Sequence, residues 1–399
     1  MASVCFYFQV HQPYRLRRYS VFDSDASYFD EPRNQAILDR VVAKCYLPAT
    51  QLLLDLIRKH EGRFSVAFSL TGVILDQFKE RHPQVIELLQ TLAKTGCVEF
   101  LAETYHHSLA FLYSHEEFLA QVDMHAVLME ELLGAKPAVF RNTELIYSNE
   151  LAEFLGKLGR YRGILSEGVD HVLAGRSANR VYRPPGDSGG DRGLKLLLKN
   201  YRLSDDIAFR FSDRGWDQWP LTADKFAGWL NRVDAKDQVC NLFMDFETFG
   251  EHQWPDTGIF EFIRALPDAI FRRTPHDIRT PSQCLAEHEP VGVYDVPHVI
   301  SWADTERDLS AWIGNAMQSN ALHELYRMEP AVKAASDPTI LRDWRRLTTS
   351  DHFYYMCTKY FSDGAVHKYF NPYASPYDSY INFMNVMDHL RSRVQGEGV

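Results

Sequence analysis

The sequence predicts an α/β fold, in which a parallel sheet or barrel of about seven strands is followed by a helical C-terminal region. In residues 1–300 short apolar runs alternate with helical periodicity, whereas from residue 305 onward strand signals give way to helical segments. The chain has 399 residues, of which 45% are hydrophobic, so it can bury a large core. We therefore expect two domains, residues 1–300 and residues 301–399, with the helical domain packed on the barrel.

The predicted strands are short apolar runs bounded by turn residues, as the buried strands of a parallel sheet usually are. In chain order they cover residues 4–10, 64–70, 97–102, 138–140, 162–165, 205–211 and 239–246.

Helices are predicted between these strands from apolar residues at i, i+3, i+4 and i+7. They cover residues 49–60, the segment between His82 and Gly96, and the segment between Ser114 and Gly134. Ser114 and Glu117 have the spacing of a capping box, and Ser148 is placed to cap the next helix. In the C-terminal region helices are expected over residues 309–327, 338–360 and 377–393.

The charge pattern argues against two classes of partner. The chain carries 43 Lys and Arg against 53 Asp and Glu, a net charge of −10, and it has no basic stripe. Nucleic acids and anionic membranes attract clustered cations, so neither is expected as a partner. No apolar run has the length of a membrane span, and the N-terminus lacks the basic segment of a signal peptide. We expect a cytoplasmic protein, and the sequence leaves its oligomeric state open.

The six cysteines lie far apart in the sequence and form no CxxC pair. Cys5, Cys97 and Cys240 lie in apolar strand runs, where a reduced thiol behaves as a small hydrophobic side chain. We therefore expect free, buried thiols, as is usual in a reducing compartment.

Polar residues cluster where four predicted strands end. The first strand leads to His11 and Gln12, the third to Glu103, the fourth to Arg141 and Glu144, and the late strand to Asp245, Glu247 and His252. In a parallel barrel the C-terminal ends of the strands meet at one mouth, where active sites lie. These residues are therefore expected to share one cleft.

Two carboxylates among these residues suggest glycoside hydrolysis. That reaction needs one ionised carboxylate and one protonated carboxyl that donates to the leaving oxygen. Arg141 favours the charged form of Glu144, whereas the apolar strand before Asp245 favours a raised pKa. The two residues can therefore divide these roles.

Aromatic residues and histidines lie near the same strand ends. Flat aromatic faces suit the apolar faces of sugar rings. The aromatic candidates are Tyr105, Tyr147, Trp216, Trp219, Phe249, Trp254 and Trp302. The histidine candidates are His11, His106, His107, His252 and His352. No HExxH spacing occurs, and adjacent His106 and His107 would point to opposite faces of a strand, so we favour hydrogen bonds to hydroxyl groups over metal ligation and expect no cofactor.

At these segments the sequence resembles glycoside hydrolase family 57, the α-amylase-like enzymes. The matching segments are HQP at residues 11–13, GCVEFLAETYHHSL at 96–109, FRNTELIY at 140–147, LFMDFETFGEHQW at 242–254 and, more weakly, TPSQCL at 280–285. The resemblance implies an incomplete (β/α)7 TIM-like barrel with a helical C-terminal domain that closes the cleft.

The resemblance also implies roles for individual residues. Glu144 is expected to be the nucleophile that forms a glycosyl-enzyme intermediate, and Asp245 the general acid/base. No metal ligands are implied. The residues expected to bind substrate are His11, Gln12, Glu103, His106, Arg141, Glu247, His252 and Trp254 from the barrel, and Asp351 and His352 from the C-terminal helices.

The expected activity is retaining cleavage of α-1,4-glucosidic bonds in starch, glycogen or maltooligosaccharides. The length of 399 residues suits the compact α-amylase group of the family better than its longer branching members. Three alternatives stay open: a 4-α-glucanotransferase or glucan-branching enzyme, a metal-dependent sugar enzyme such as a deacetylase or zinc mannosidase, and a non-catalytic glucan-binding protein.

Overall fold

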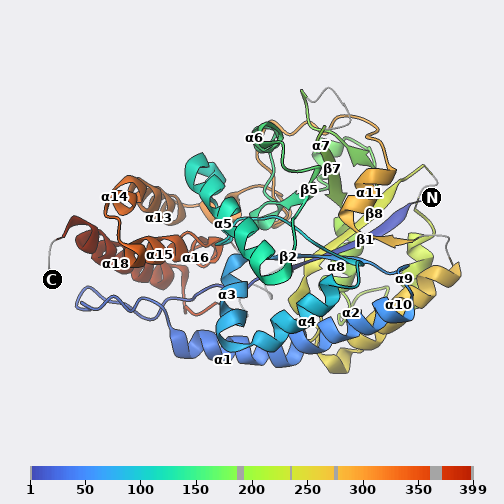
Figure 1. Cartoon of the computed structure of the whole chain (residues 1–399), viewed down its shortest axis with the longest axis horizontal. Helices are drawn as coiled ribbons and strands as arrows, with labels where there is room; N and C mark the ends of the chain where they lie inside the picture. The colour runs from blue at the N-terminus through green and yellow to red at the C-terminus, as the bar shows by residue number, and fades with distance from the viewer. Residues whose placement is uncertain (1, 187–192, 234–235, 274–276, 360–370, 397–399) are drawn as a thin grey trace.

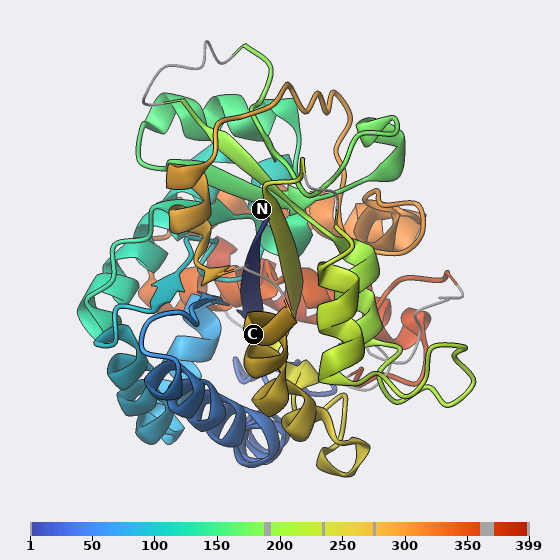
Figure 2. The same ribbon diagram turned by 90° about the vertical axis from the view of Figure 1, so that its right-hand side faces the viewer.

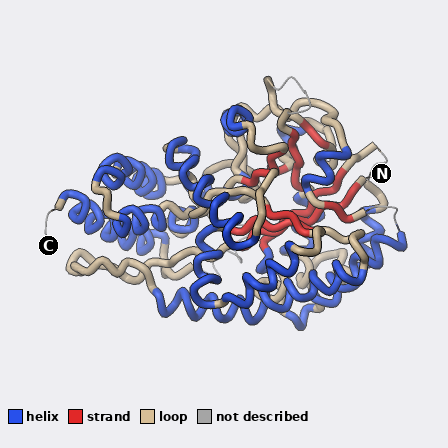
Figure 3. The backbone as a smooth tube through the Cα atoms, in the orientation of Figure 1, coloured by secondary structure: helices blue, strands red, loops and turns tan. Residues whose placement is uncertain are grey.

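The strands of the protein gather in one group, and helices cover them and extend away toward the C-terminus (Figures 1 and 3). The computed structural model describes residues 2–186, 193–233, 236–273, 277–359 and 371–396. In Figure 1 the strands lie on the right, and α13 (Ala316–Arg327) and α18 (Pro376–Gln395) lie at the far left.

One curled sheet forms the core of the barrel. Its main path is made of parallel neighbours in the order β3 (Val98–Phe100), β2 (Val66–Leu70), β1 (Ser3–Val10), β8 (Val239–Asp245), β7 (Lys195–Lys199), β5 (Gly163–Glu167) and β4 (Val139–Arg141). Beside this path, β6 (Val181–Tyr182) pairs with β7 in the antiparallel direction, and β9 (Ile278–Arg279) pairs with β1.

The two ends of this path meet. Ala102, just after β3, pairs with Phe140 of β4, and the Ala102 amide donates to the Val139 carbonyl at 2.9 Å. The junction of β7 and β8 is sparse, since Lys199 and Asn241 form its one ladder pair among the described residues. Helices lie outside the strands in Figure 2. The expected incomplete (β/α)7 barrel with a helical C-terminal region is thus confirmed.

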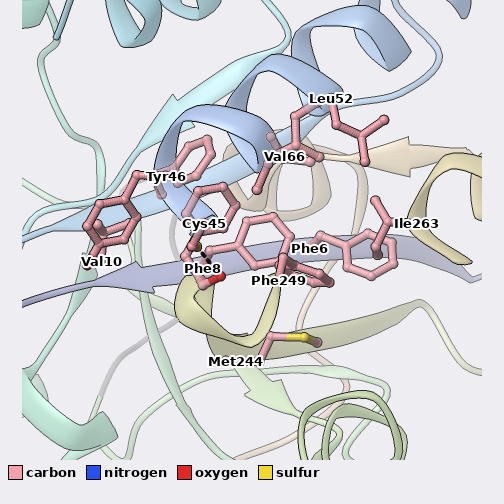
Figure 4. Packing of buried hydrophobic residues seen from close by; sticks show 14 of the residues in the cluster. Phe6, Phe8, Val10, Cys45, Tyr46, Leu52, Val66, Met244, Phe249 and Ile263 are labelled. Carbon is pink, nitrogen blue, oxygen red and sulfur yellow. Dashed lines mark hydrogen bonds between the residues drawn. The ribbon is translucent and has the colours of Figure 1, made fainter. Parts of the chain in front are cut away.

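Side chains alternate across the strands, as strand geometry requires. On β1, Phe6 and Phe8 face outward and pack in a cluster with Leu52 of α2 (Leu47–Lys59). Figure 4 shows this outer layer, in which the Cys45 thiol donates to the Phe246 carbonyl at 3.1 Å. Tyr7 belongs instead to a separate inner cluster with side chains from the other strands.

The helices around the barrel follow the strands in sequence. Besides α2 they are α1 (Glu31–Val41), α3 (Gly72–Arg81), α4 (Pro83–Ala93), α5 (His115–Leu133), α6 (Asn149–Leu158), α7 (Asp170–Leu173), α8 (Tyr201–Ala208), α9 (Ala223–Leu230), α10 (Ile259–Arg273) and α11 (Pro281–Glu287). Besides α13 and α18, the C-terminal helices are α12 (Ser310–Ile313), α14 (Glu329–Ala334), α15 (Pro338–Leu347) and α16 (Ser350–Tyr354).

The predicted N-caps of two helices are confirmed. The Ser114 hydroxyl accepts from the Glu117 amide at 3.1 Å, and the Ser148 hydroxyl accepts from the Leu151 amide at 3.3 Å. The capping box at Ser114 is only half formed, because the Glu117 carboxylate pairs with the Arg345 guanidinium at 2.8 Å. Glu117 thereby ties α5 of the barrel to α15 of the C-terminal region.

Three predicted elements are wrong. Residues 205–211 are not a strand, because α8 covers most of them. The Asn200 side chain caps this helix at the Leu203 amide, and Ser204, Ile207 and Ala208 form its buried face. The strand at this place in the barrel is β7, a run of three leucines between two lysines.

The helix predicted over 309–327 is interrupted, because α12 ends at Ile313 and Asn315, with a ψ of 168°, caps α13. The helix predicted over 338–360 is interrupted as well. It ends with α15 at Leu347, and Thr349 has a ψ of 130° before α16 begins at Ser350. Residue 360 lies outside the described residues. The domain boundary near residue 300 stays a prediction.

The cysteines and the helix lengths agree with the expectations from sequence. All six cysteines are free and buried. Within the described ranges, no helix combines the length and apolar character needed to cross a membrane.

Replacing Trp344 with Ala is expected to lower the free energy of unfolding by about 3–5 kcal/mol, because it leaves a large cavity in the C-terminal core. Trp344 is fully buried, and its indole N–H donates to the Leu325 carbonyl at 2.9 Å. Urea unfolding of Trp344→Ala measures the change. The control is Phe22→Ala, which removes a side chain that is 93% exposed and should change stability by less than about 0.5 kcal/mol. Equal effects of the two changes would contradict this packing.

Candidate active site

The four strand ends singled out in the sequence surround one pocket. Its volume is about 710 Å³. It is lined by Gln9, His11, Gln12, Pro13, Arg15, His107, Arg141, Glu144, Asp245, Glu247, His252, Trp302, Asp351, Tyr354 and Tyr355. Eight of the twelve residues proposed from the sequence line this pocket. Glu144 and Asp245 are both among them.

The backbone after β4 turns Glu144 into the pocket. A single 3-10 turn, η3 (Thr143–Leu145), follows Arg141, and Glu144 has a φ of 57° in the left-handed region. Such a φ is strained for a non-glycine residue and is often found at functional sites. One carboxylate oxygen, Oε1, lies 3.0 Å from His107 Nε2, and the other, Oε2, accepts from the Trp302 indole N–H at 2.6 Å.

These donors keep the Glu144 carboxylate ionised. Burial by itself would raise its pKa. The hydrogen bond and positive charge of His107, together with Arg141 and the Trp302 N–H, outweigh burial and lower the pKa to about 2. The sequence indicated Arg141 as the cause, but His107 contributes more.

His107 is held between two carboxylates. Its Nε2 faces Glu144, and its Nδ1 lies 3.5 Å from Glu103 Oε2. Burial opposes a charged imidazole, but the hydrogen bonds to Glu103 and Glu144 raise the His107 pKa to about 9. Glu103 is fully buried and accepts from the Ser69 hydroxyl at 2.7 Å. A protonated His107 therefore donates to both carboxylates.

Asp245 has the opposite electrostatic character. It ends the apolar strand β8, and burial followed by the negative charge of Glu144 raises its pKa to about 7. Arg141 and His107 act in the lowering direction without cancelling these effects. The direction expected from the sequence for each carboxyl group is thus confirmed: Glu144 is ionised, and Asp245 holds its proton up to near neutral pH.

Glu247 lies two residues after Asp245, in η4 (Phe246–Thr248). It accepts from the Tyr46 hydroxyl and from the Gln12 amide. Burial and the charge of Asp245 raise the Glu247 pKa well above its usual range. The loop then turns at Gly250, whose φ is 111°, and a Cβ there would lie 2.0 Å from the Lys44 carbonyl oxygen. Only glycine fits this turn.

The C-terminal region contributes to the same pocket. His11 Nε2 lies 3.1 Å from Asp351 Oδ2, its Nδ1 lies 2.9 Å from the Thr71 hydroxyl, and its ring stacks on His107 with centroids 4.3 Å apart. The His11 hydrogen bond outweighs burial and lowers the pKa of Asp351 well below its usual range. The pairing of His11 with Asp351 joins the end of β1 to α16.

Four residues proposed to bind substrate lie outside the pocket lining. Glu103 lies behind His107. His107 lines the pocket and His106 does not, because the side chains of adjacent residues point in different directions. The His106 ring lies beside the Tyr105 ring, with centroids 4.9 Å apart. Trp254 is 52% exposed and lies under the Lys44 ammonium. His352 packs on Phe383 of α18 with ring centroids 5.8 Å apart.

The structure also places the candidate aromatic residues and the weakly matching segment at 280–285. Among the seven candidate aromatic residues, Trp302 lines the pocket. In the weakly matching segment at 280–285, the Thr280 hydroxyl caps α11, and Glu99 Oε1 accepts from the Ser282 hydroxyl at 2.6 Å. Glu99 belongs to β3, whose following residues lead to Glu103, so this contact lies toward the opposite end of the barrel from the pocket.

A second pocket of about 540 Å³ borders the same carboxyl groups. It shares Glu144, Asp245 and Trp302 with the first pocket. Its other lining residues are Lys199, Asp205, Phe209, Ala303, Asp304, Arg307 and Trp312. Glu144 and Asp245 are thus accessible from both pockets.

The sequence did not identify Lys199 and Arg307 as site residues. Lys199 looks like an ordinary charged residue at the end of a strand, and Arg307 lies in an irregular loop. The position of Lys199 at a strand end was the signal that could have identified it.

A comparison with known protein families shows the family of this chain. The sequence model described as glycosyl hydrolase family 57 matches residues 5–297. A protein of Methanocaldococcus jannaschii named "Putative alpha-amylase" is 42% identical over 398 residues, which is 96% of this chain and 83% of that protein. An alpha-amylase of Pyrococcus horikoshii is 22% identical over 73% of this chain, but the match spans only 43% of that longer relative.

Solved structures share the fold. A family 57 branching enzyme from Thermococcus kodakaraensis superposes with a TM-score of 0.70 at 14% identity, covering 99% of this chain and 90% of the other. A 4-alpha-glucanotransferase from Thermococcus litoralis gives a TM-score of 0.66 at 17% identity, covering 88% of this chain and 56% of the other.

Proposed function

The chain belongs to glycosyl hydrolase family 57, and we propose that it cleaves α-1,4-glucosidic bonds of starch, glycogen or maltooligosaccharides with retention of configuration. The observation that carries the proposal is the pairing of an ionised Glu144 with a protonated Asp245 in one pocket. A retaining glycosidase requires these two states before each turnover.

The reaction then has two steps. In the first, a Glu144 oxygen attacks the anomeric carbon while Asp245 gives its proton to the leaving glycosidic oxygen, and a covalent glycosyl-enzyme forms. In the second, the Asp245 carboxylate takes a proton from water, which attacks the anomeric carbon and releases Glu144. His107 and Trp302 orient the Glu144 carboxylate through both steps.

The polar lining of the pocket suits a neutral sugar. Hydrogen bonds between polar side chains and hydroxyl groups are electrostatically stronger in a buried site than in water. We assign this role to Gln12, Arg141, Glu247, His252 and Asp351, which lie around the carboxylate pair. The proposed steps use no metal, so activity should persist after exhaustive chelation; its loss would favour the metal-dependent alternative.

The rate should depend on pH through Asp245. The enzyme is active while Asp245 is protonated, so kcat/KM is expected to fall above about pH 7. Glu144 stays ionised down to about pH 2, so its titration causes no loss between pH 4 and 7. A pH profile of kcat/KM on a maltooligosaccharide checks this expectation. A constant rate up to pH 9 would contradict the role of Asp245 as acid.

A second candidate function is transfer of the glycosyl group to another sugar. The second pocket, which borders the same two carboxyl groups, favours it as the place where an acceptor would approach. Incubation with maltotriose separates the candidates: shorter sugars alone indicate hydrolysis, and oligomers longer than the substrate indicate transfer. Glucan binding with no new products from the wild type would instead indicate a non-catalytic binding protein.

A further inference from the structure

A cluster of four charged side chains lies beside the active site, at the ends of β5 and β7. We call Glu167, Lys199, Asp205 and Arg307 the buried charge cluster. Lys199 Nζ lies 3.6 Å from Glu167 Oε2 and 3.4 Å from Asp205 Oδ1. Arg307 completes the set, 4.0 Å from Glu167 and 3.8 Å from Asp205.

The cluster is costly to bury. The side chain of Lys199 is 2% exposed and that of Glu167 is fully buried. Removing charges from water costs free energy that mutual attraction only partly returns, so apolar residues could stabilise such a position equally well. Lys199 also lies at the sparse junction of β7 and β8. Stability alone therefore does not explain why these charged residues are buried here, next to the active site.

Two members of the cluster contact Trp302. The Lys199 ammonium lies over the Trp302 ring, 4.9 Å from its centroid, and the Arg307 guanidinium donates to the Trp302 carbonyl. Cation–π contacts of this kind are stronger when they are shielded from water. The Trp302 ring also packs against Phe243 of β8, with centroids 5.0 Å apart.

Trp302 in turn is tied to Glu144 by two hydrogen bonds. Its backbone amide donates to the Glu144 carbonyl at 3.2 Å, and its indole N–H donates to Glu144 Oε2 at 2.6 Å. The cluster, the indole ring and the carboxylate thus form one continuous series of contacts, in which Lys199 fixes the ring and the ring fixes the carboxylate.

We propose that Lys199 is a positioning residue, which holds the Trp302 indole so that its N–H aims at Glu144. The inference rests on the proposed function, in which Glu144 is the nucleophile. Correct aim of the attacking oxygen matters because a misplacement of about 1 Å can cost about 100-fold in rate.

Lys199 also acts on Asp245 through its charge. The titratable and charged groups around Asp245 are the carboxyl groups of Glu144 and Glu247 and the cations Arg141, His107 and Lys199. Asp205 and Arg307 line the second pocket together with Asp245. Lys199 favours the ionised form of Asp245, so its loss should raise the Asp245 pKa. The alkaline limb of the pH profile should then move to higher pH.

Replacing Lys199 with Met tests the proposal in the full chain. The change Lys199→Met is expected to lower kcat by about 10- to 100-fold with little change in KM, and to shift the alkaline limb upward. Lys199→Arg, which keeps the cation, should recover most of both properties. The control Lys195→Met removes a cation from the other end of β7, where Lys195 contacts the Leu285 and His288 carbonyls, and should leave kcat and the pH profile unchanged.

A double-mutant comparison shows whether Lys199 acts through Trp302. Trp302→Phe keeps an aromatic ring but removes the N–H donor to Glu144. In this background Lys199→Met should lower kcat much less than it does in the wild type. An undiminished effect, or a folded Lys199→Met variant with wild-type kcat and pH profile, would overturn the proposal.

Two further variants keep the outcomes separable. If Lys199→Met does not fold, Arg307→Met takes its place, since it removes the donor to the Trp302 carbonyl. Wild-type kcat in that variant would count against the proposal. Glu144→Gln distinguishes a failure of the proposed function from a failure of the positioning role of Lys199. If it stays active, the proposed function fails, whereas an inactive Glu144→Gln beside a fully active Lys199→Met refutes only the positioning role.

Discussion

The variant Glu144→Gln is expected to lower kcat on maltooligosaccharides by about 10,000-fold or more, because an amide cannot attack the anomeric carbon to form the glycosyl-enzyme. The fold should survive, since Gln keeps the shape of the side chain and can accept from the Trp302 N–H through its amide oxygen. The measurement is the initial rate of reducing-sugar release, with circular dichroism to check folding.

Chemical rescue makes this test specific for the nucleophile. With α-glucosyl fluoride, which needs no proton from Asp245, azide should enter the space left by the Glu144 oxygen and give the β-glucosyl azide. Glu150→Gln is the matched control, because Glu150 lies six residues further on with a side chain 71% exposed. Substantial turnover by Glu144→Gln without azide would refute the assignment of Glu144.

The variant Asp245→Asn is expected to show a loss that depends on the leaving group. On maltooligosaccharides kcat/KM should fall by about 100- to 10,000-fold, since the departing sugar oxygen no longer receives a proton. With α-glucosyl fluoride the first step should stay fast, because fluoride leaves without protonation. Azide should then intercept the glycosyl-enzyme and give the α-glucosyl azide.

The configuration of the azide product thus distinguishes the two carboxyl groups. Asp256→Asn serves as the matched control, because Asp256 is an exposed residue of the 3-10 turn η5 (Pro255–Thr257), which follows the pocket residue His252. If Asp245→Asn lost the same factor on both substrates, Asp245 would not be the general acid.

Most of the barrel could be predicted because its strands are fully buried. Runs such as those of β1 and β8 are apolar on both faces, since one face packs on helices and the other fills the barrel. The wrong prediction at residues 205–211 arose where the strand is not a long apolar run. A short strand flanked by lysines precedes α8, whose Ile207 and Ala208 look equally strand-like without knowledge of the Asn200 cap.

The candidate site could be predicted in part for a related reason. Topology alone brings strand ends together, so His11, Glu144 and Asp245 were expected to meet before any side chain was placed. Finer choices depend on local backbone geometry. His107, with a φ of 51°, enters the pocket in place of His106, and no periodicity in the sequence indicates that turn.

Contacts from distant segments were the hardest to anticipate. Trp302 was predicted at the mouth, but its hydrogen bond to Glu144 joins residues 158 positions apart. Asp351 reaches His11 across 340 positions. Such pairs follow from how the C-terminal region packs on the barrel, and a single sequence carries no direct signal of that packing.

The stereochemistry of the first product tests the central claim most directly. Proton NMR of an early time course on maltopentaose, recorded before mutarotation, reports the anomer released. A double displacement by Glu144 and Asp245 is expected to give the α-anomer first. Initial release of the β-anomer would show a single displacement by water and would contradict the proposed retaining mechanism.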